Sequence, residues 1–255
     1  LLGEPSFLSA LSNFAQQGYF ERLQIDLPAE LAPQHIRLFD NEKLRVSMEY
    51  VITGTLGMFF LFILNKGIYP YTECRLTTNL PQGLSATVDQ DCAIKFDREG
   101  QVISRLFRLK CTNFFEVTPR LNIALAKLNY VESFSIELPF KIEYFMLPLR
   151  SMGPELWRLW EDLRPFESSI EVTGRVTPTY SIACKLMKLP FVQSYFKVSV
   201  PQLNVWSIML AGQLHGADML AIIEVNSEET VGTVVVRSPS PVLRKVVGQS
   251  LTEML

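Results

Sequence analysis

The stretch Glu132-Ser133-Phe134-Ser135-Ile136-Glu137-Leu138 alternates polar and apolar side chains. Successive side chains of a β-strand point to opposite faces of the sheet, so this pattern predicts a strand with one face in a core and the other in water. Similar alternating or apolar runs, separated by Gly, Pro, Asn and Asp, cover 44–52, 58–64, 72–78, 102–112, 119–127 and 131–139. Strands at this spacing predict a β-sandwich.

The pattern changes after Pro148. The segment Ser151-Met152-Gly153-Pro154 offers a cap and an early proline for a helix that continues through Leu163. A helix over 180–189, three strands over 203–215, 218–226 and 230–237, and a last helix over 241–255 complete the prediction. The fold class is therefore mixed: an immunoglobulin-like β-sandwich over 35–148, then an α+β platform over 149–255 with an antiparallel sheet and flanking helices.

Residues 1–34 are interpreted as the end of a linker or hinge and a lead-in to the sandwich, because Pro28 and Pro33 punctuate them. Helical spacing of apolar side chains allows an amphipathic helix over 7–20, formed by Phe7, Leu8, Leu11, Phe14 and Ala15. A packed lead-in segment is the alternative interpretation. We expect no signal peptide, since no basic region or cleavage site marks this stretch.

Composition excludes several classes of protein. Apolar residues make up 48% and charged residues 20% of the chain, and its formal charge is -2, which disfavours a nucleic-acid partner. The apolar stretch 51–64 is shorter than the roughly 20 residues that a membrane-spanning helix needs. The cysteines lie far apart, as expected of a reducing cytosol without zinc: Cys74, Cys92, Cys111 and Cys184.

A search for catalytic patterns predicts no enzyme, no cofactor and no metal. Neither a Gly-x-Ser-x-Gly elbow nor a phosphate-binding glycine loop occurs. His215-Gly216-Ala217-Asp218 could pair an imidazole with a carboxylate, but its position between two predicted strands favours a hairpin turn. The acidic clusters 89–91 and 97–99 lack the further ligands and the glycine of a calcium loop, which favours solvated loops.

The helix before Leu163 carries two tryptophans. Its apolar stripe, made of Met152, Leu156, Leu159 and Leu163, predicts the face that packs on the core. Trp160 falls at the edge of this stripe and Trp157 points away from it, toward solvent. Indole rings are frequent anchors in interfaces, so the pair predicts a peptide-binding surface. A loop over 164–175 that covers Trp157 is the alternative.

An ordered series of segments spans the two predicted domains: Asp40 to Leu44, Leu56 to Phe62, Asn65-Lys66, Leu121 to Ile123, Ile136 to Pro139, Lys141 to Phe145, and then Met152, Trp157, Trp160 and Leu163. In this order the chain resembles, over about 36–255, the C-terminal appendage (ear) of clathrin adaptor large subunits of the alpha-adaptin family. The resemblance implies a β-sandwich followed by a platform, joined to the coat by a flexible linker.

The resemblance also implies site residues. Platforms of this family bind Asp-Pro-Phe/Trp and Phe-x-Asp-x-Phe peptides around a tryptophan that Trp160 matches, with Trp157 as its aromatic neighbour and with Glu224 and Arg237 at two polar positions. Ile222 and Thr233 depart from the family, which carries arginines there, and this predicts a less acidic peptide. A second site on the sandwich maps to Phe62 and Gln101, where Ser47 and Leu64 replace small glycines and Leu64 could fill the groove. Phe62 as an ordinary strand residue is the alternative.

By this resemblance the chain would recruit endocytic accessory proteins in clathrin-mediated endocytosis. It would lie in the cytoplasm at plasma-membrane coated pits, meet the other adaptor subunits through the rest of the full-length chain, and reach the membrane only through the coat. Three alternatives remain open: an appendage of another vesicle coat, a structural domain packed within a larger assembly, and an enzyme.

Overall fold

The computed structural model describes residues 34–67, 70–88, 93–127, 130–149, 154–174, 182, 185–186, 189, 196–200, 205–226 and 230–255. The chain divides into two compact units, Leu1–Phe140 and Lys141–Leu255.

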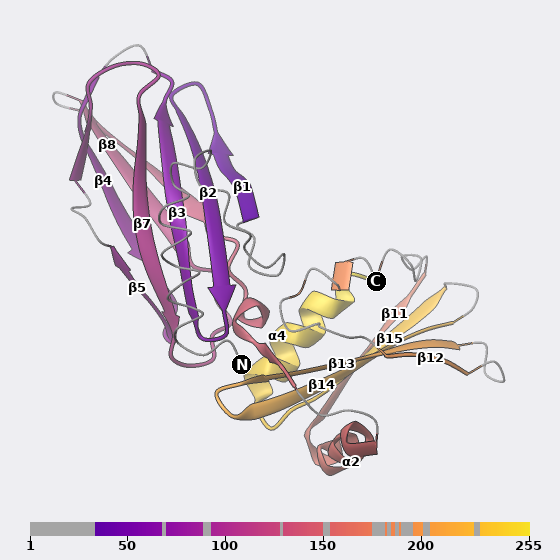
Figure 1. The fold of residues 1–255 in the computed structure, drawn as a ribbon. Helices are drawn as coiled ribbons and strands as arrows, with labels where there is room; N and C mark the ends of the chain where they lie inside the picture. Colours follow the sequence, from indigo (N-terminus) through magenta and orange to yellow (C-terminus); the bar gives the residue numbers. More distant parts are fainter. Residues whose placement is uncertain are drawn as a thin grey trace, which may run out of the picture. The chain divides into compact units, whose positions relative to one another are not determined.

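The first unit is a β-sandwich of two antiparallel sheets (Figure 1). The five-stranded sheet has the order β1 (Gln34–Asp40), β2 (Leu44–Thr53), β3 (Leu56–Asn65), β7 (Val102–Cys111) and β5 (Leu84–Val88). The four-stranded sheet has the order β6 (Ala93–Phe96), β4 (Tyr71–Asn79), β8 (Arg120–Lys127) and β9 (Tyr130–Glu137). The sandwich predicted from strand spacing is confirmed.

The core of the sandwich forms where the inner faces of the two sheets meet. Phe59 on β3 lies opposite Phe107 on β7, and their rings stack with centroids 4.6 Å apart. Phe140, which follows β9, closes on the same ring with a centroid separation of 5.3 Å. Alternate residues of β2 and β3 fill the layer with fully buried side chains: Leu44, Val46, Met48, Leu61 and Ile63.

Three strands of this unit were not predicted, and each lies at the edge of a sheet. Strand β1 carries a register shift between Arg37 and Phe39, which breaks the two-residue alternation on which strand prediction depends. Strands β5 and β6 are short, so few residues carry any pattern. Edge strands are solvated along one side and need no continuous apolar run.

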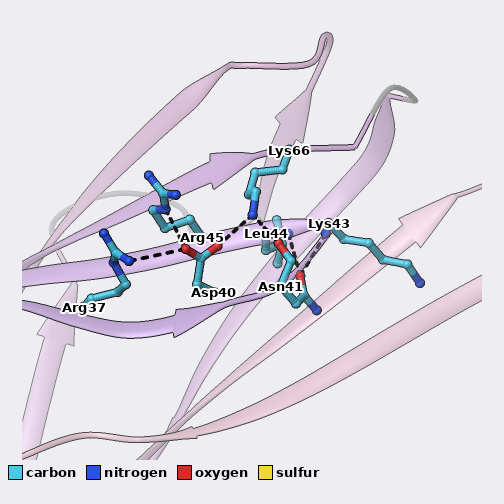
Figure 2. A network of polar contacts seen from close by, with 7 residues as sticks. All are labelled: Arg37, Asp40, Asn41, Lys43, Leu44, Arg45 and Lys66. Atoms are coloured by element: carbon cyan, nitrogen blue, oxygen red, sulfur yellow. Dashed lines mark hydrogen bonds and ion pairs between the residues drawn. The ribbon is translucent and has the colours of Figure 1, made fainter.

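The β1–β2 turn explains part of the Asp40 to Leu44 segment quoted above. Asn41 Oδ1 accepts hydrogen bonds from the backbone N–H groups of Lys43, at 2.9 Å, and Leu44, at 2.8 Å. Asp40 accepts from Arg45 Nε at 3.0 Å and from Lys66 Nζ at 2.8 Å (Figure 2). These cations lower the pKa of the Asp40 carboxyl, the bond from Lys66 having the largest effect. The segment therefore closes a hairpin and ties it to the end of β3.

The second unit is built on one antiparallel sheet. Its order is β10 (Leu147–Pro148), β13 (Val205–Leu214), β14 (Ala217–Asn226), β15 (Val231–Arg237) and β11 (Glu167–Thr173), with β12 (Phe196–Val200) also paired to β13. Helix α4 (Pro241–Thr252) packs on β11, β14 and β15, and helix α2 (Pro154–Asp162) packs on the opposite face (Figure 1). The 3-10 turns η2 (Ile142–Phe145) and η3 (Arg164–Phe166) precede β10 and β11. The α+β prediction is confirmed.

Several boundaries differ from the prediction. The units divide after Phe140, not after Pro148, because η2 packs against α4 and Lys141 pairs with Glu253 at 3.4 Å. The predicted loop 164–175 contains strand β11, whose alternation is weak because Ser168 occupies an inward-facing position where an apolar residue would mark a strand. Of the predicted helix 180–189, the structure describes Ile182, Lys185 and Leu186 as helical and also describes Leu189; the remainder, like the predicted helix 7–20, lies outside the described residues.

The predicted hairpin turn at His215-Gly216 is confirmed. Leu214 pairs with Ala217 across it, and the two turn residues have φ values of 50° and 76°. Positive φ at both central residues is the geometry of a type I′ turn, in which glycine is favoured. His215 therefore lies exposed at a hairpin tip.

Candidate platform site

The face of the second sheet that carries α2 is organised in rows of paired residues. One row runs Ser169, Val235, Ile222, Met209 across β11, β15, β14 and β13, and the row beside it runs Glu167, Arg237, Leu220, Ala211. Helix α2 covers these two rows where they cross β13, β14 and β15, whereas Glu167 and Ser169 on β11 are exposed. The covered part is an apolar cluster of Leu156, Trp160, Leu163, Met209, Leu220 and Ile222. The partly buried side chains Leu159 and Val235 form its rim.

Trp160 belongs to the centre of this cluster. The residue is only 6% exposed. Its position on the helix predicted a place at the edge of the apolar stripe, where more of the residue would be exposed. The difference arises because a helix lying across a sheet is covered over a wider arc than the four residues of the stripe suggested. The side chain of Trp157 lies outside the described part of the structure, so its role as an exposed anchor stays a prediction.

Arg237 is committed to contacts within the unit. Its guanidinium carbon lies 3.8 Å from the centre of the Trp160 ring, and Nη1 donates a 2.6 Å hydrogen bond to the Trp160 carbonyl oxygen. Nε and Nη2 both reach Glu167 Oε2, at 2.8 Å and 2.6 Å. With 7% of the residue exposed, Arg237 holds the end of α2 against β11 and has few donors left for a peptide.

The next row of the sheet lies beyond the cover of α2. Glu171 and Glu224 flank Thr233 in register; both glutamates are exposed and Thr233 is half-buried. Paired residues on adjacent strands lie about 5 Å apart at Cβ, so the two carboxylates line one short strip. We call Glu171, Thr233 and Glu224 the open row. It borders Val235, which lies in the neighbouring row on the same face, so the apolar rim of the cluster meets an acidic strip there.

The structure therefore brings together five of the six predicted platform residues at one edge of α2, either in the cluster or in the rows beside it: Trp160, Ile222, Arg237, Thr233 and Glu224. Glu167 was not predicted as part of this group. Its partner is Arg237, which lies 70 positions away in the sequence. No local pattern signals that pairing.

Two of the predicted sandwich residues, Phe62 and Leu64, share one face of the five-stranded sheet. Ser47, Phe62 and Ser104 pair across β2, β3 and β7, and Arg45, Leu64 and Val102 form the next row on the same face. Gln101 precedes β7, and its side-chain Oε1 accepts a 2.7 Å hydrogen bond from the backbone of Asp97. That contact holds Gln101 in the 97–101 turn. Leu64 lies beside Phe62 in register, as the resemblance implied.

Among the described residues, no group of three or more His, Cys, Asp or Glu side chains is placed to hold a metal ion. No helix in that part of the chain is long and apolar enough to cross a membrane.

No protein-family model matches the chain, and no curated protein matches it. Among solved structures, the yeast GGA1 GAE domain is similar, with 14% identity, a TM-score of 0.34, and coverage of 42% of this chain and 100% of that one. The GAE domain of GGA2p from Saccharomyces cerevisiae is 8% identical, with a TM-score of 0.36 and coverage of 43% and 98%. At these TM-scores the likeness adds no argument about what this chain does.

Proposed function

We propose that this chain is an appendage domain of a clathrin adaptor large subunit that recruits accessory proteins by binding short linear motifs. The observation that supports the proposal is the platform itself: a tryptophan-bearing helix lies on one face of an antiparallel sheet, following a β-sandwich, in the order that the sequence resemblance implies. We further propose that the chain is of the alpha-adaptin family and recruits endocytic accessory proteins in the cytoplasm, at coated pits of the plasma membrane. The membrane and the other adaptor subunits would be reached through the full-length protein.

The proposed peptide lies along the rim of the α2 cluster and the open row. The rim offers apolar contact from Leu159 and Val235, which suits an aromatic side chain. The open row offers the carboxylates of Glu171 and Glu224. The two arginines that the resemblance implies are absent, because Ile222 and Thr233 occupy their positions. Arg237 is already held by Glu167 and Trp160. A peptide aspartate therefore gains no charge-assisted hydrogen bond here, and a neutral or basic residue beside the aromatic one is favoured.

Single motifs should bind weakly. An extended peptide buries little area and loses conformational freedom on binding, so we expect a Kd of about micromolar or weaker, with avidity supplied by repeated motifs.

The test uses fluorescently labelled peptides that contain Asp-Pro-Phe, Asn-Pro-Phe or Lys-Pro-Phe, titrated against the 255-residue chain. Fluorescence anisotropy should show saturable binding, with the aspartate peptide no tighter than the other two. Thr233→Arg restores the cation that the resemblance implies and should tighten the aspartate peptide roughly threefold to tenfold at low salt. Thr77→Arg, at an exposed position of β4 in the sandwich, is the matched control and should change nothing.

The outcomes separate the parts of the proposal. A clear preference of the unmodified chain for aspartate would refute the inferred peptide chemistry but keep the binding function. Binding that Thr233→Arg leaves unchanged for all three peptides would place the site elsewhere. No binding by any peptide at millimolar concentration would refute motif recruitment through this platform.

A further inference from the structure

Strand β11 is an edge of the second sheet that lacks the usual protection against pairing with another strand. Its seven residues pair with β15 in unbroken antiparallel register, from Glu167 opposite Arg237 to Thr173 opposite Val231. Natural sheet edges are commonly protected by a lysine, a proline, a bulge or a very short strand, because an unprotected edge pairs with other chains. Strand β11 has none of these features, and its only charged residues are Glu167 and Glu171.

The four edge strands of the described sandwich differ from β11. Strand β1 has a register shift between Arg37 and Phe39, and β5 and β6 have only five and four residues. Strand β9 is longer, but β1 lies against it, with the ring of Phe39 5.3 Å from the ring of Phe134. Length and an unbroken register therefore distinguish β11 from these protected edges.

Hydrogen bonds at both ends of the β11–β15 pair show which backbone groups face outward. Gly174 N–H donates to the Thr230 carbonyl oxygen at 2.9 Å, and Ser238 N–H donates to the Phe166 carbonyl oxygen at 3.1 Å. Both bonds continue the β11–β15 register, and in an antiparallel ladder the bonded pairs alternate with pairs that exchange no bond. The even-numbered residues of β11 therefore bond to β15. The N–H and C=O groups of the odd-numbered residues point away from the sheet.

The odd-numbered residues of β11 offer an accessible row of backbone groups. They are Glu167, Ser169, Glu171 and Thr173, and all four are exposed. Within the described residues, their backbone N–H and C=O groups have no hydrogen-bond partner. An extended peptide that lies antiparallel along this edge can bond to them. In this mode of recognition, main-chain hydrogen bonds supply affinity and alternate side chains supply specificity.

The side chains beside this edge determine which peptide fits. On the α2 face, Glu171 and Glu224 are exposed in one row, and no ion pair within the described residues neutralises Glu171. A lysine or arginine opposite Glu171 on an added strand would lie about 5 Å from it at Cβ. On the other face, Ile170 and Val172 are half-buried where α4 packs on β11, and they offer apolar contact. The edge therefore fits a strand that alternates basic and apolar residues.

We propose that β11 is a docking edge for an extended, basic segment of a partner protein, which adds to the sheet as an antiparallel strand. The basic side chains of this segment lie on the α2 face, opposite Ser169 and Glu171. Its apolar side chains lie on the α4 face, beside Ile170 and Val172. This binding uses backbone groups of β11 and needs neither the rim nor an aromatic motif residue, so it goes beyond the function proposed above and does not depend on it.

The first test uses the peptide Lys-Val-Arg-Val-Arg-Val-Lys, which matches the seven residues of β11 in length. The peptide carries a fluorophore at its N-terminus and an amide at its C-terminus, and fluorescence anisotropy measures its binding to the 255-residue chain. In the proposed arrangement the basic residues point their N–H groups at β11, and the valines point theirs away. N-methylation of both arginines should weaken binding at least about tenfold. N-methylation of the second and third valines keeps the same composition and charge and should change binding less than about twofold.

Variants of the chain test where the peptide binds. Ser169→Pro removes an N–H group that points away from β15, so the β11–β15 ladder is kept and peptide binding should fall at least about tenfold. Ser169→Ala is its matched control and should bind like the unmodified chain. Glu171→Lys should weaken binding about threefold to tenfold at low salt, whereas Glu99→Lys, the same charge change at an exposed position of the sandwich, should have no effect.

The outcomes decide the proposal. Equal binding of the two N-methylated peptides, a preference for methylated arginines, or no binding of the unmodified peptide at millimolar concentration would overturn it. Binding that Ser169→Pro leaves unchanged would overturn it too, as would a dimer of the chain that ultracentrifugation detects and Ser169→Pro abolishes. If Ser169→Pro unfolds the second unit, the pair of N-methylated peptides on the unmodified chain decides. Failure of the Pro-Phe peptides, which would refute motif recruitment, does not affect this result.

Discussion

Replacing Arg237 by alanine should destabilise the second unit by about 3 kcal/mol. The side chain makes three kinds of contact: a hydrogen bond to the Trp160 carbonyl at 2.6 Å, an ion pair with Glu167 at 2.6 Å, and stacking on the Trp160 ring at 3.8 Å. These contacts connect β15, α2 and β11. The buried guanidinium is therefore the polar link between the helix and the sheet edge.

The magnitude follows from those contacts. A hydrogen bond that involves a charged group contributes about 1.5–3 kcal/mol, and a cation over an indole ring about 0.5–2 kcal/mol. The contributions do not add fully, because Glu167 is partly exposed and water solvates it once Arg237 is gone. Arg237→Lys keeps the charge but loses the planar fork, so about half of the loss should remain.

Tryptophan fluorescence in urea measures this unit selectively. All three tryptophans, Trp157, Trp160 and Trp206, belong to Lys141–Leu255, so the signal reports that unit alone. With a urea m-value of about 1.5 kcal/mol/M, the midpoint should fall by about 2 M in Arg237→Ala and about 1 M in Arg237→Lys. A loss below about 1 kcal/mol in the alanine variant, or a lysine variant as stable as the unmodified chain, would refute the assigned role of the guanidinium fork.

Three further predictions concern other buried or hydrogen-bonded groups. Burial raises the pKa of the Glu143 carboxyl, and a hydrogen bond from the Ser250 hydroxyl has a smaller, opposite effect. The stability that this carboxyl contributes is therefore present below its unfolded pKa and is lost as the pH rises through the folded pKa. Glu143→Gln should raise the urea midpoint of the second unit at pH 7 and make that midpoint less dependent on pH. Burial raises the pKa of the Cys74 thiol to about 12 and that of Cys111 to about 11, so at pH 8 iodoacetamide should modify neither until the sandwich opens, and rapid labelling seen by mass spectrometry would contradict their burial. Asn41→Ala removes two hydrogen bonds from the β1–β2 turn and should lower the free energy of unfolding of the sandwich by about 1–2 kcal/mol. Chemical denaturation followed by circular dichroism measures this loss. The control Val102→Ala, at an exposed position, should change the free energy of unfolding by no more than about 0.5 kcal/mol.

The candidate site shows the limit of reasoning from sequence alone. Helical periodicity identified the apolar side of α2, but it placed Trp160 at the edge of the apolar stripe and not at the centre of the buried cluster. The sheet beneath the helix decides how wide an arc is covered, and that sheet includes strands far away in the sequence: Arg237, which contacts Trp160, lies 77 positions from it.

Local pattern was sufficient for the long central strands, for the His215-Gly216 turn and for the helices α2 and α4, because alternation, glycine placement and helical spacing act between near neighbours in the chain. The edge strands β1, β5 and β11 carry a weaker signal: β1 has a register shift, β5 is only five residues long, and β11 has the polar Ser168 on its inward-facing side. A solvated edge does not require a continuous apolar alternation. The sequence alone therefore determined a sandwich followed by an α+β platform. Only the tertiary structure decided that Arg237 is bound by Glu167 and Trp160, because these contacts depend on which distant segments pack together.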